Sequence, residues 1–285
     1  MIRPAKLAFW LLLGVASTAL MASLRSTPAR AETQSGACPK EMVAVRSFCI
    51  DRWEISLVDD SSGESLSPYY PPEPRLLRAA RDYWLIARLE VGDESARRMP
   101  LPELSERQLG GSFAPRAMSQ PGVVPQAYLS QHMARRACER ARKRLCTKDE
   151  WLTACRGEHG TKYPYGSSYL RGRCNVFRTL HPAQLLHGNA SIGHRDPRLN
   201  LIVESGKDPL LRLTGATASC TSTWGTERIY DMVGNVDEWV DAEGGLFLGG
   251  FYARSTTKGC EAEVSAHSQS YFDYSTGARC CADPK

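Results

Sequence analysis

The chain has 285 residues, of which 42% are hydrophobic and 24% are charged, with 36 basic and 31 acidic side chains. The hydrophobic fraction excludes a disordered chain, and the charged fraction is ordinary for a globular protein of one large domain or two small ones. The 23 glycines and 17 prolines indicate many turns rather than long helices, and the ten cysteines are the unusual feature of the composition.

The N-terminal residues have the pattern of an export signal. Two basic residues precede an apolar run over residues 7–24, and the small-residue site Ala-Arg-Ala follows at 29–31. This order predicts a signal peptide over residues 1–31 and a mature domain over residues 32–285. An uncleaved membrane anchor is the alternative, because the run is just long enough to span a bilayer. No later segment is apolar enough to do so, and we therefore expect a secreted, periplasmic or cell-envelope protein without a membrane span after cleavage.

Cleavage changes the charge balance of the protein. The predicted signal peptide contains four basic residues and no acidic one, so the mature chain has 32 basic against 31 acidic side chains. Because the excess of positive charge lies in the export signal, the main support for a nucleic-acid partner is lost. We expect no nucleic-acid partner.

All ten cysteines follow the predicted cleavage site. An even number of cysteines in an exported chain indicates a disulfide framework of up to five bridges, although the residues alone leave its connectivity open. No Cys-x-x-Cys pair occurs, which disfavours a structural zinc site on these thiols.

The remaining pattern predicts short strands, an irregular segment and two helices. Residues 38–57 resemble a β-hairpin, and nine of the 17 prolines make residues 58–127 a Pro-rich insertion on the core. Within the insertion we expect one short helix, with one apolar face formed by Leu77, Ala80, Trp84, Leu85 and Leu89.

Apolar residues at spacings of three and four predict a helix over residues 130–145. Its Arg-rich side is interpreted as a solvated face, with an anion or polysaccharide patch as the alternative. Thr147 and Glu150 form the capping-box pattern of a second helix, and Gly157 provides its C-terminal stop. The rest of the chain is Gly-rich with short apolar pieces, so the sequence predicts an α+β domain with small, irregular sheets.

Six ordered blocks of the chain resemble the formylglycine-generating enzyme, or sulfatase-modifying factor, family. They are 42–54 (MVAVRSFCIDRWE), 143–151 (KRLCTKDEW), 155–166 with its CRG and YPYG ends, 230–239 (YDMVGNVDEW), 248–252 (LGGFY) and 277–280 (GARC). Each block is weak by itself, whereas the ordered set is specific to this family. The resemblance implies a single loop-rich α+β domain of the C-type-lectin-like fold, stapled by disulfides.

The resemblance also implies how the cysteines pair. Positions similar to those of the family join Cys138 to Cys280 and Cys155 to Cys260. The scheme expected for the other six is Cys38–Cys49, Cys174–Cys220 and Cys146–Cys281.

The family's oxidase holds a copper(I) ion with two nearby cysteines, because this soft ion is best bound by thiolates. In the corresponding stretch of this chain, Arg254 stands at the first thiol position and Gly259 at the second, beside Cys260. Phe251 replaces the family's active-site serine, and Asp237 replaces the tryptophan of its VWEW motif. We therefore expect a degenerate active-site cleft, no catalytic residues and no copper.

The family's calcium-binding positions are better preserved. The resemblance implies that one Ca²⁺ ion is held by two side chains and two backbone carbonyls, those of Asp231, Glu238, Gly234 and Val236. Oxygen donors of these kinds suit calcium. A second site would begin at Asn175 and Val176. On spacing alone, Asp231 and Glu238 would be interpreted as turn caps.

These observations favour an exported, non-catalytic binding or surface module whose ligand is a protein or a saccharide. The alternative is an active formylglycine-generating oxidoreductase that modifies a sulfatase cysteine or a related substrate through a relocated site. A thiol count distinguishes the two, because a thiol–copper oxidase needs at least two free cysteines.

Overall fold

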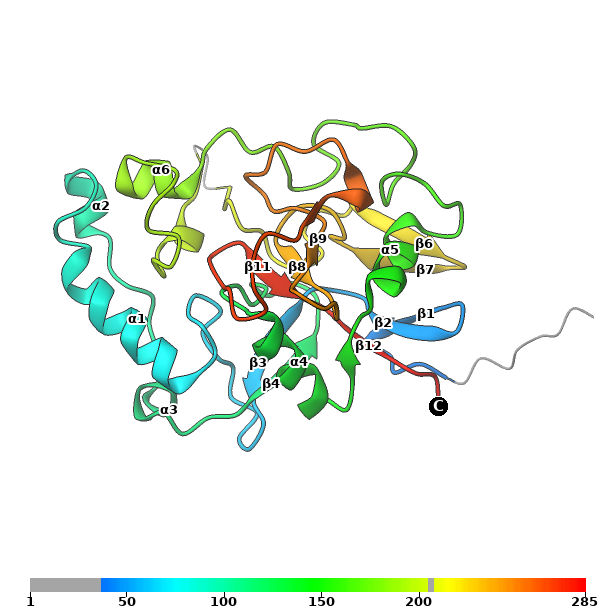
Figure 1. Cartoon of the computed structure of the whole chain (residues 1–285), viewed down its shortest axis with the longest axis horizontal. Helices are drawn as coiled ribbons and strands as arrows, with labels where there is room; N and C mark the ends of the chain where they lie inside the picture. The colour runs from blue at the N-terminus through cyan, green and yellow to red at the C-terminus, as the bar shows by residue number, and fades with distance from the viewer. Residues whose placement is uncertain (1–36, 205–207) are drawn as a thin grey trace, which may run out of the picture. The chain divides into compact units, whose positions relative to one another are not determined.

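The computed structural model describes residues 37–204 and 208–285, which belong to one compact unit (Figure 1). The signal peptide predicted over residues 1–31 lies outside the described residues. Within the described ranges, no helix has both the length and the hydrophobicity needed to cross a bilayer.

The first sheet joins the two ends of the domain. Its strand order is β1 (Met42–Val45), β2 (Phe48–Asp51), β12 (Cys280–Ala282) and β5 (Arg144–Leu145). Strands β1 and β2 form the predicted hairpin, with Arg46 in the left-handed region at φ 52° in its turn. The C-terminal strand β12 lies between β2 and β5, so the sheet needs both ends of the chain.

The second sheet contains strand β8, on which Asp237 and Glu238 lie. Its order is β10 (Glu263–Val264), β9 (Phe247–Leu248), β8 (Asp237–Trp239) and β11 (Thr276–Ala278), with β8 and β11 parallel. Two further ribbons pair β3 (Ile55–Asp59) with β4 (Pro115–Ser119) and β6 (Thr221–Trp224) with β7 (Glu227–Tyr230). These strands have two to five residues each, which confirms the predicted α+β fold with small sheets.

The helix predicted over 130–145 is shorter than expected. Helix α4 (Gln131–Arg140) ends where Arg142 takes a positive φ of 57° and the Lys143 N–H bonds the Cys138 carbonyl. Arg144 and Leu145 form strand β5 because they pair with β12. The next helix, α5 (Lys148–Arg156), begins with the predicted capping box of Thr147 and Glu150.

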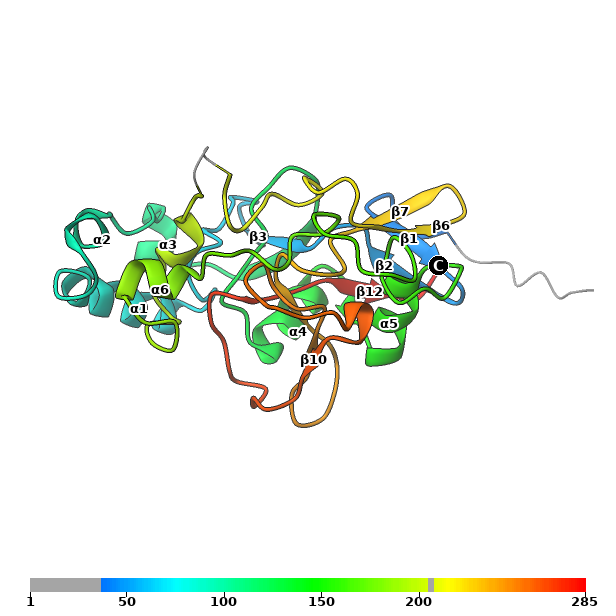
Figure 2. The ribbon, with the colours of Figure 1, turned by 90° about the horizontal axis from the view of Figure 1, so that it is seen from above.

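The Pro-rich insertion contains more regular structure than predicted. It holds strand β4 and the helices α1 (Pro74–Ala87), α2 (Glu94–Arg98) and α3 (Glu106–Gly110). Leu77 and Trp84 are buried as expected, but Leu85 is exposed and Leu89 lies beyond the helix end and is exposed too. The three helices lie with α6 (Pro182–His187) on the side of the domain away from the β1–β2 hairpin (Figure 1, Figure 2).

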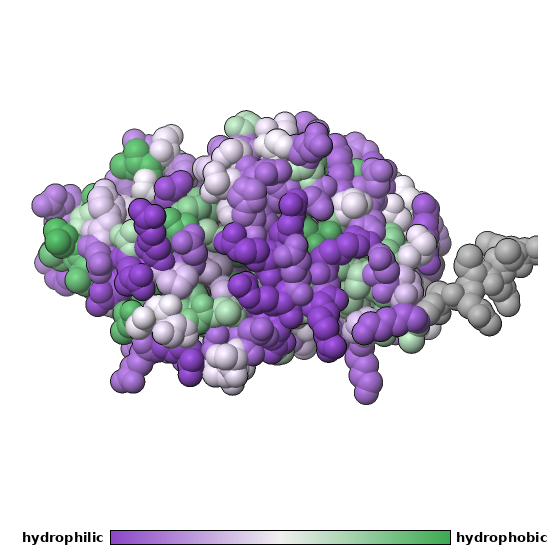
Figure 3. Space-filling view, turned by 60° about the horizontal axis from the view of Figure 1, so that its bottom comes forward, coloured by the Kyte–Doolittle hydropathy of each residue, from purple (hydrophilic) through white to green (hydrophobic). Residues whose placement is uncertain are grey.

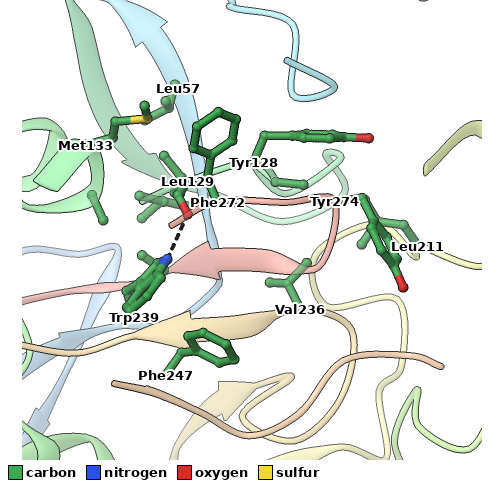
Figure 4. Packing of buried hydrophobic residues seen from close by; sticks show 14 of the residues in the cluster. Leu57, Tyr128, Leu129, Met133, Leu211, Val236, Trp239, Phe247, Phe272 and Tyr274 are labelled. Atoms are coloured by element: carbon green, nitrogen blue, oxygen red, sulfur yellow. Dashed lines mark hydrogen bonds between the residues drawn. The ribbon is translucent and has the colours of Figure 1, made fainter. Parts of the chain in front are cut away.

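Two hydrophobic clusters form the core. In the larger one, the Trp239 indole N–H donates to the Leu129 carbonyl at 2.7 Å, and Phe247 packs edge-on against Trp239 (Figure 4). The smaller cluster surrounds Trp151 and contains three cystine bridges. Bridging sulfur atoms are thus part of the packed interior of this loop-rich domain.

The structure contains five disulfides and leaves no cysteine free. The bridges include the two that the resemblance implied, Cys138–Cys280 and Cys155–Cys260, and the three expected for the remaining cysteines, Cys38–Cys49, Cys146–Cys281 and Cys174–Cys220. Such a framework is typical of proteins in an oxidising, extracytoplasmic compartment.

The Arg-rich side of α4 faces solvent. Arg136 and Arg140 are exposed, and Arg135 pairs with Asp241 across a surface contact of 2.5 Å. Figure 3 brings forward the side of the domain that carries α4, and hydrophilic side chains cover most of its middle. These three residues agree with the predicted solvated face, whereas the side chain of Lys143, which was expected on the same face, is buried and pairs with Asp51 and Glu41.

Candidate functional site

The degenerate cleft predicted from the sequence is built at the start of β8. The Asp237 N–H donates to the Ser275 carbonyl at 2.8 Å, which fixes the start of β8 next to the loop before β11. After β9, Gly249 and Gly250 turn the chain with φ values of 89° and 75°. This turn returns Arg254 to β8, where its Nη2 donates to Asp237 Oδ2 at 2.7 Å.

Arg254 also lies over the ring of Phe251, with its guanidinium carbon 5.4 Å from the ring centroid. The structure therefore brings together three of the four residues expected at the degenerate site, Asp237, Phe251 and Arg254. A buried carboxylate, a guanidinium and an aromatic ring stand where the resemblance places thiol chemistry. An ion pair of this kind offers no ligand for copper(I).

The fourth position, Gly259, packs against a different segment. A Cβ atom built on Gly259 would lie 2.3 Å from the Lys162 carbonyl and 2.9 Å from the Tyr163 ring, and the residue has a positive φ of 62°. A cysteine at this position would thus require the backbone of residues 162–163 to move. Cys260, the neighbouring thiol in the sequence, is bonded to Cys155.

Asp237 is the most perturbed acid of this site. Its side chain is buried, and Oδ1 has no hydrogen-bond partner among the described residues. Burial raises the pKa of Asp237 to about 7, because desolvation outweighs the opposing charge of Arg254, and Asp273 raises it further. A carboxyl that titrates near neutrality can exchange a proton with a neighbouring group.

This raised pKa predicts how the stability of the protein depends on pH. A carboxyl that binds its proton more tightly in the folded state makes the free energy of unfolding fall as the pH rises from about 4 to about 7. We expect Asp237→Asn to make this fall shallower, as measured by urea unfolding across that pH range. The exposed Asp82→Asn is the matched control, and equal slopes for both variants would contradict the prediction.

Tyr271 and Tyr274 form an aromatic wall beside the ion pair of Arg254 and Asp237, and the sequence did not indicate it. The Asp273 carboxylate accepts hydrogen bonds from the Ser275 N–H, the Ser275 hydroxyl and the Tyr271 hydroxyl. Tyr274 packs edge-on against Phe251, and its hydroxyl lies 3.1 Å from Nε2 of His181. Burial and Asp273 raise the pKa of both Tyr271 and Tyr274, so their hydroxyls stay protonated.

The carboxylates predicted to bind calcium surround an arginine. Both Glu238 oxygens accept from Arg279, at 2.6 Å each, and one of them also accepts from the Trp151 indole at 2.6 Å. Asp231 accepts from the Gly215 N–H at 2.7 Å, and Glu54 lies close enough to interact with both carboxylates.

Burial raises the pKa of Asp231 to about 7 and that of Glu54 well above its usual range. The buried Arg279 cation thus neutralises part of a carboxylate cluster that a calcium ion would otherwise have to neutralise. Within the described residues, no group of three or more His, Cys, Asp or Glu side chains is placed to hold a metal. Both oxygens of Glu238 are engaged by Arg279 in this structure.

The other predicted calcium residues lie next to this cluster. A Cβ atom on Gly234 would meet the Asn175 carbonyl at 2.2 Å, so the two segments are in close contact. The Asn175 side-chain amide donates to the Leu210 carbonyl and to Asn235, and Val236 donates its N–H to Glu54. Asn175 Oδ1 is buried without a partner, whereas Val176 packs into the smaller core cluster. Calcium binding stays a prediction of the sequence.

Residues 18–282 match the family described as the sulfatase-modifying factor enzyme 1-like domain. The chain belongs to this family. The match begins within the residues predicted as a signal peptide and extends to the last strand. None of the curated proteins matches the sequence.

Two solved structures are similar to this sulfatase-modifying factor enzyme 1-like domain. The crystal structure of CarF has 13% sequence identity and a TM-score of 0.40, over 84% of this chain and 87% of CarF. The structure of PvdO from Pseudomonas aeruginosa has 14% identity and a TM-score of 0.37, over 83% of this chain and 80% of PvdO.

Proposed function

We propose that this chain is an exported binding member of the sulfatase-modifying factor family that lacks thiol–copper oxidase chemistry. The main observation in support of this proposal is that all ten cysteines are in disulfides. Copper(I) in the family's oxidase is held by thiolates, and a disulfide sulfur has no thiolate to offer.

The packing at both expected thiol positions supports the same proposal. Arg254 forms a 2.7 Å ion pair with Asp237, and Gly259 has no room for a side chain. Restoring a metal-binding pair would therefore require two substitutions, a broken ion pair and a backbone shift. The domain keeps its stapled scaffold and uses its surface loops for binding, which is where binding residues are commonly found.

The test is a thiol count on the unreduced, denatured protein, followed by incubation with Cu(I) and a cysteine-containing sulfatase peptide. We expect no free thiol before reduction, ten after reduction and no formylglycine in the peptide. The fully reduced protein serves as the control for detection of all thiols. Two or more thiols together with formylglycine would overturn the proposal and establish the alternative, an active oxidoreductase with a relocated site.

A further inference from the structure

A groove of about 510 Å³ lies between α1 and two loops, residues 191–195 and 271–273. We name it the α1 groove. Its volume is in the range of small-molecule sites. The groove borders the aromatic wall described above, because Tyr271 and Asp273 line it as well. It is formed by three segments that are far apart in the sequence, one of which belongs to the Pro-rich insertion.

Helix α1 supplies an apolar wall that is already formed. Leu77 and Trp84 are buried and hold the helix on the domain, and Trp84 packs against the His187 ring at 5.3 Å. The small side chain of Ala80 leaves space beside Tyr83, whose side chain is 63% exposed. An exposed aromatic ring above a small residue provides a surface on which a flat ligand can stack.

Arg195 provides a positive charge at the opposite wall of the groove. Its guanidinium carbon lies 4.4 Å from the centroid of Phe272, which holds the side chain over the groove by a cation–π contact. Across the described part of the chain, Arg195 makes no ion pair and no side-chain hydrogen bond. Its hydrogen-bond donors are therefore available to a ligand.

The acid in the groove's lining, Asp273, forms no ion pair with Arg195. The carboxylate of Asp273 is buried and accepts three hydrogen bonds, from the Ser275 N–H, the Ser275 hydroxyl and the Tyr271 hydroxyl. The nearby His194 uses Nε2 to contact the Ala190 carbonyl at 2.8 Å. The groove thus combines an apolar, aromatic wall with one available guanidinium, which is complementary to an aromatic anion.

We propose that the α1 groove binds a small aromatic carboxylate, with its ring against Tyr83 and Ala80 and its carboxylate paired with Arg195. The planar guanidinium matches a carboxylate with two parallel hydrogen bonds. This inference rests on the proposed binding role and gives it a place and a ligand class. It does not involve the cysteines, so the thiol count and the binding assay can fail independently.

The experiment is calorimetric titration of the purified protein with 2-naphthoate, 2-naphthalenemethanol and 2-naphthylmethylamine. We expect 2-naphthoate to bind with one-to-one stoichiometry, and the neutral alcohol and the cationic amine to bind at least about tenfold more weakly. Arg195→Gln removes the charge of an exposed side chain and should weaken 2-naphthoate binding about tenfold without affecting the alcohol.

Two further variants separate the groove from the rest of the surface. Ala80→Trp fills the groove and should abolish binding of all three probes, whereas Arg136→Gln makes the same charge change on α4 and should leave binding unchanged. Circular dichroism establishes that each variant is folded. Equal binding of the carboxylate and the alcohol, no binding of 2-naphthoate, or an Arg136→Gln effect as large as that of Arg195→Gln would each overturn the proposal.

Discussion

Replacing Arg279 with methionine is expected to lower the free energy of unfolding by about 3–5 kcal/mol, because it leaves buried carboxylates without their cation. The Arg279 side chain is fully buried. It donates two hydrogen bonds of 2.6 Å to Glu238 and two more to the carbonyls of Asp51 and Tyr230. A methionine fills similar space but satisfies none of these acceptors.

Urea unfolding measures this effect, and Arg98→Met provides the matched control. Arg98 pairs with Glu94 on the surface, where both side chains are about three-quarters exposed, so its loss should cost less than about 1 kcal/mol. The double variant Arg279→Met with Glu238→Leu should recover part of the stability, since it removes one unpaired buried charge. Similar losses for Arg279→Met and Arg98→Met would show that the buried cluster does not hold the domain together.

Removing the Cys138–Cys280 bridge is the second change with a large expected effect. The bridge closes a segment with a sequence separation of 142 and joins α4 to the C-terminal strand. In the chain-entropy account, a disulfide restricts the unfolded chain more when the closed loop is longer. Because Cys146–Cys281 already joins the same two segments, the loop that Cys138–Cys280 closes in the unfolded chain runs through that bridge and is short. The variant Cys138→Ala with Cys280→Ala should therefore lose about 2–3 kcal/mol of unfolding free energy.

The Cys38–Cys49 bridge is the internal comparison, because its sequence separation is only 11. The variant with alanine at both positions should lose a similar amount, because the two bridges close loops of similar length in the unfolded chain. Urea unfolding of the two double variants gives the difference directly. Losses that differ by more than about 2 kcal/mol would mean that local packing of the cystines, rather than restriction of the unfolded chain, dominates their contribution.

Local patterns predicted those parts of the fold that depend on neighbouring residues. The hairpin at residues 42–51 and the capping box at Thr147 are of this kind, since turn and cap geometry are set by a few adjacent residues. The helix end at Arg140 was missed because strand β5 exists only by pairing with β12, more than a hundred residues later. In the same way, β4 became a strand because β3 lies beside it.

The candidate site also combines residues that the sequence indicated with residues that only the structure revealed. The sequence placed Asp237, Phe251 and Arg254 in one site through the resemblance, and the structure brings them into contact. The surroundings were not visible in the sequence. Tyr271 and Asp273 lie six and four residues before the 277–280 block, and that proximity is the one signal that could have found them.

The amino-acid sequence by itself determined the family of this protein, because family membership follows from residue identities in an ordered set of motifs. Only the tertiary structure decided that Glu238 is bound to Arg279 and that Arg195 faces an apolar helix across a groove. Burial and charge pairing depend on residues brought together from distant parts of the chain. Such contacts leave no trace in the spacing of neighbouring residues.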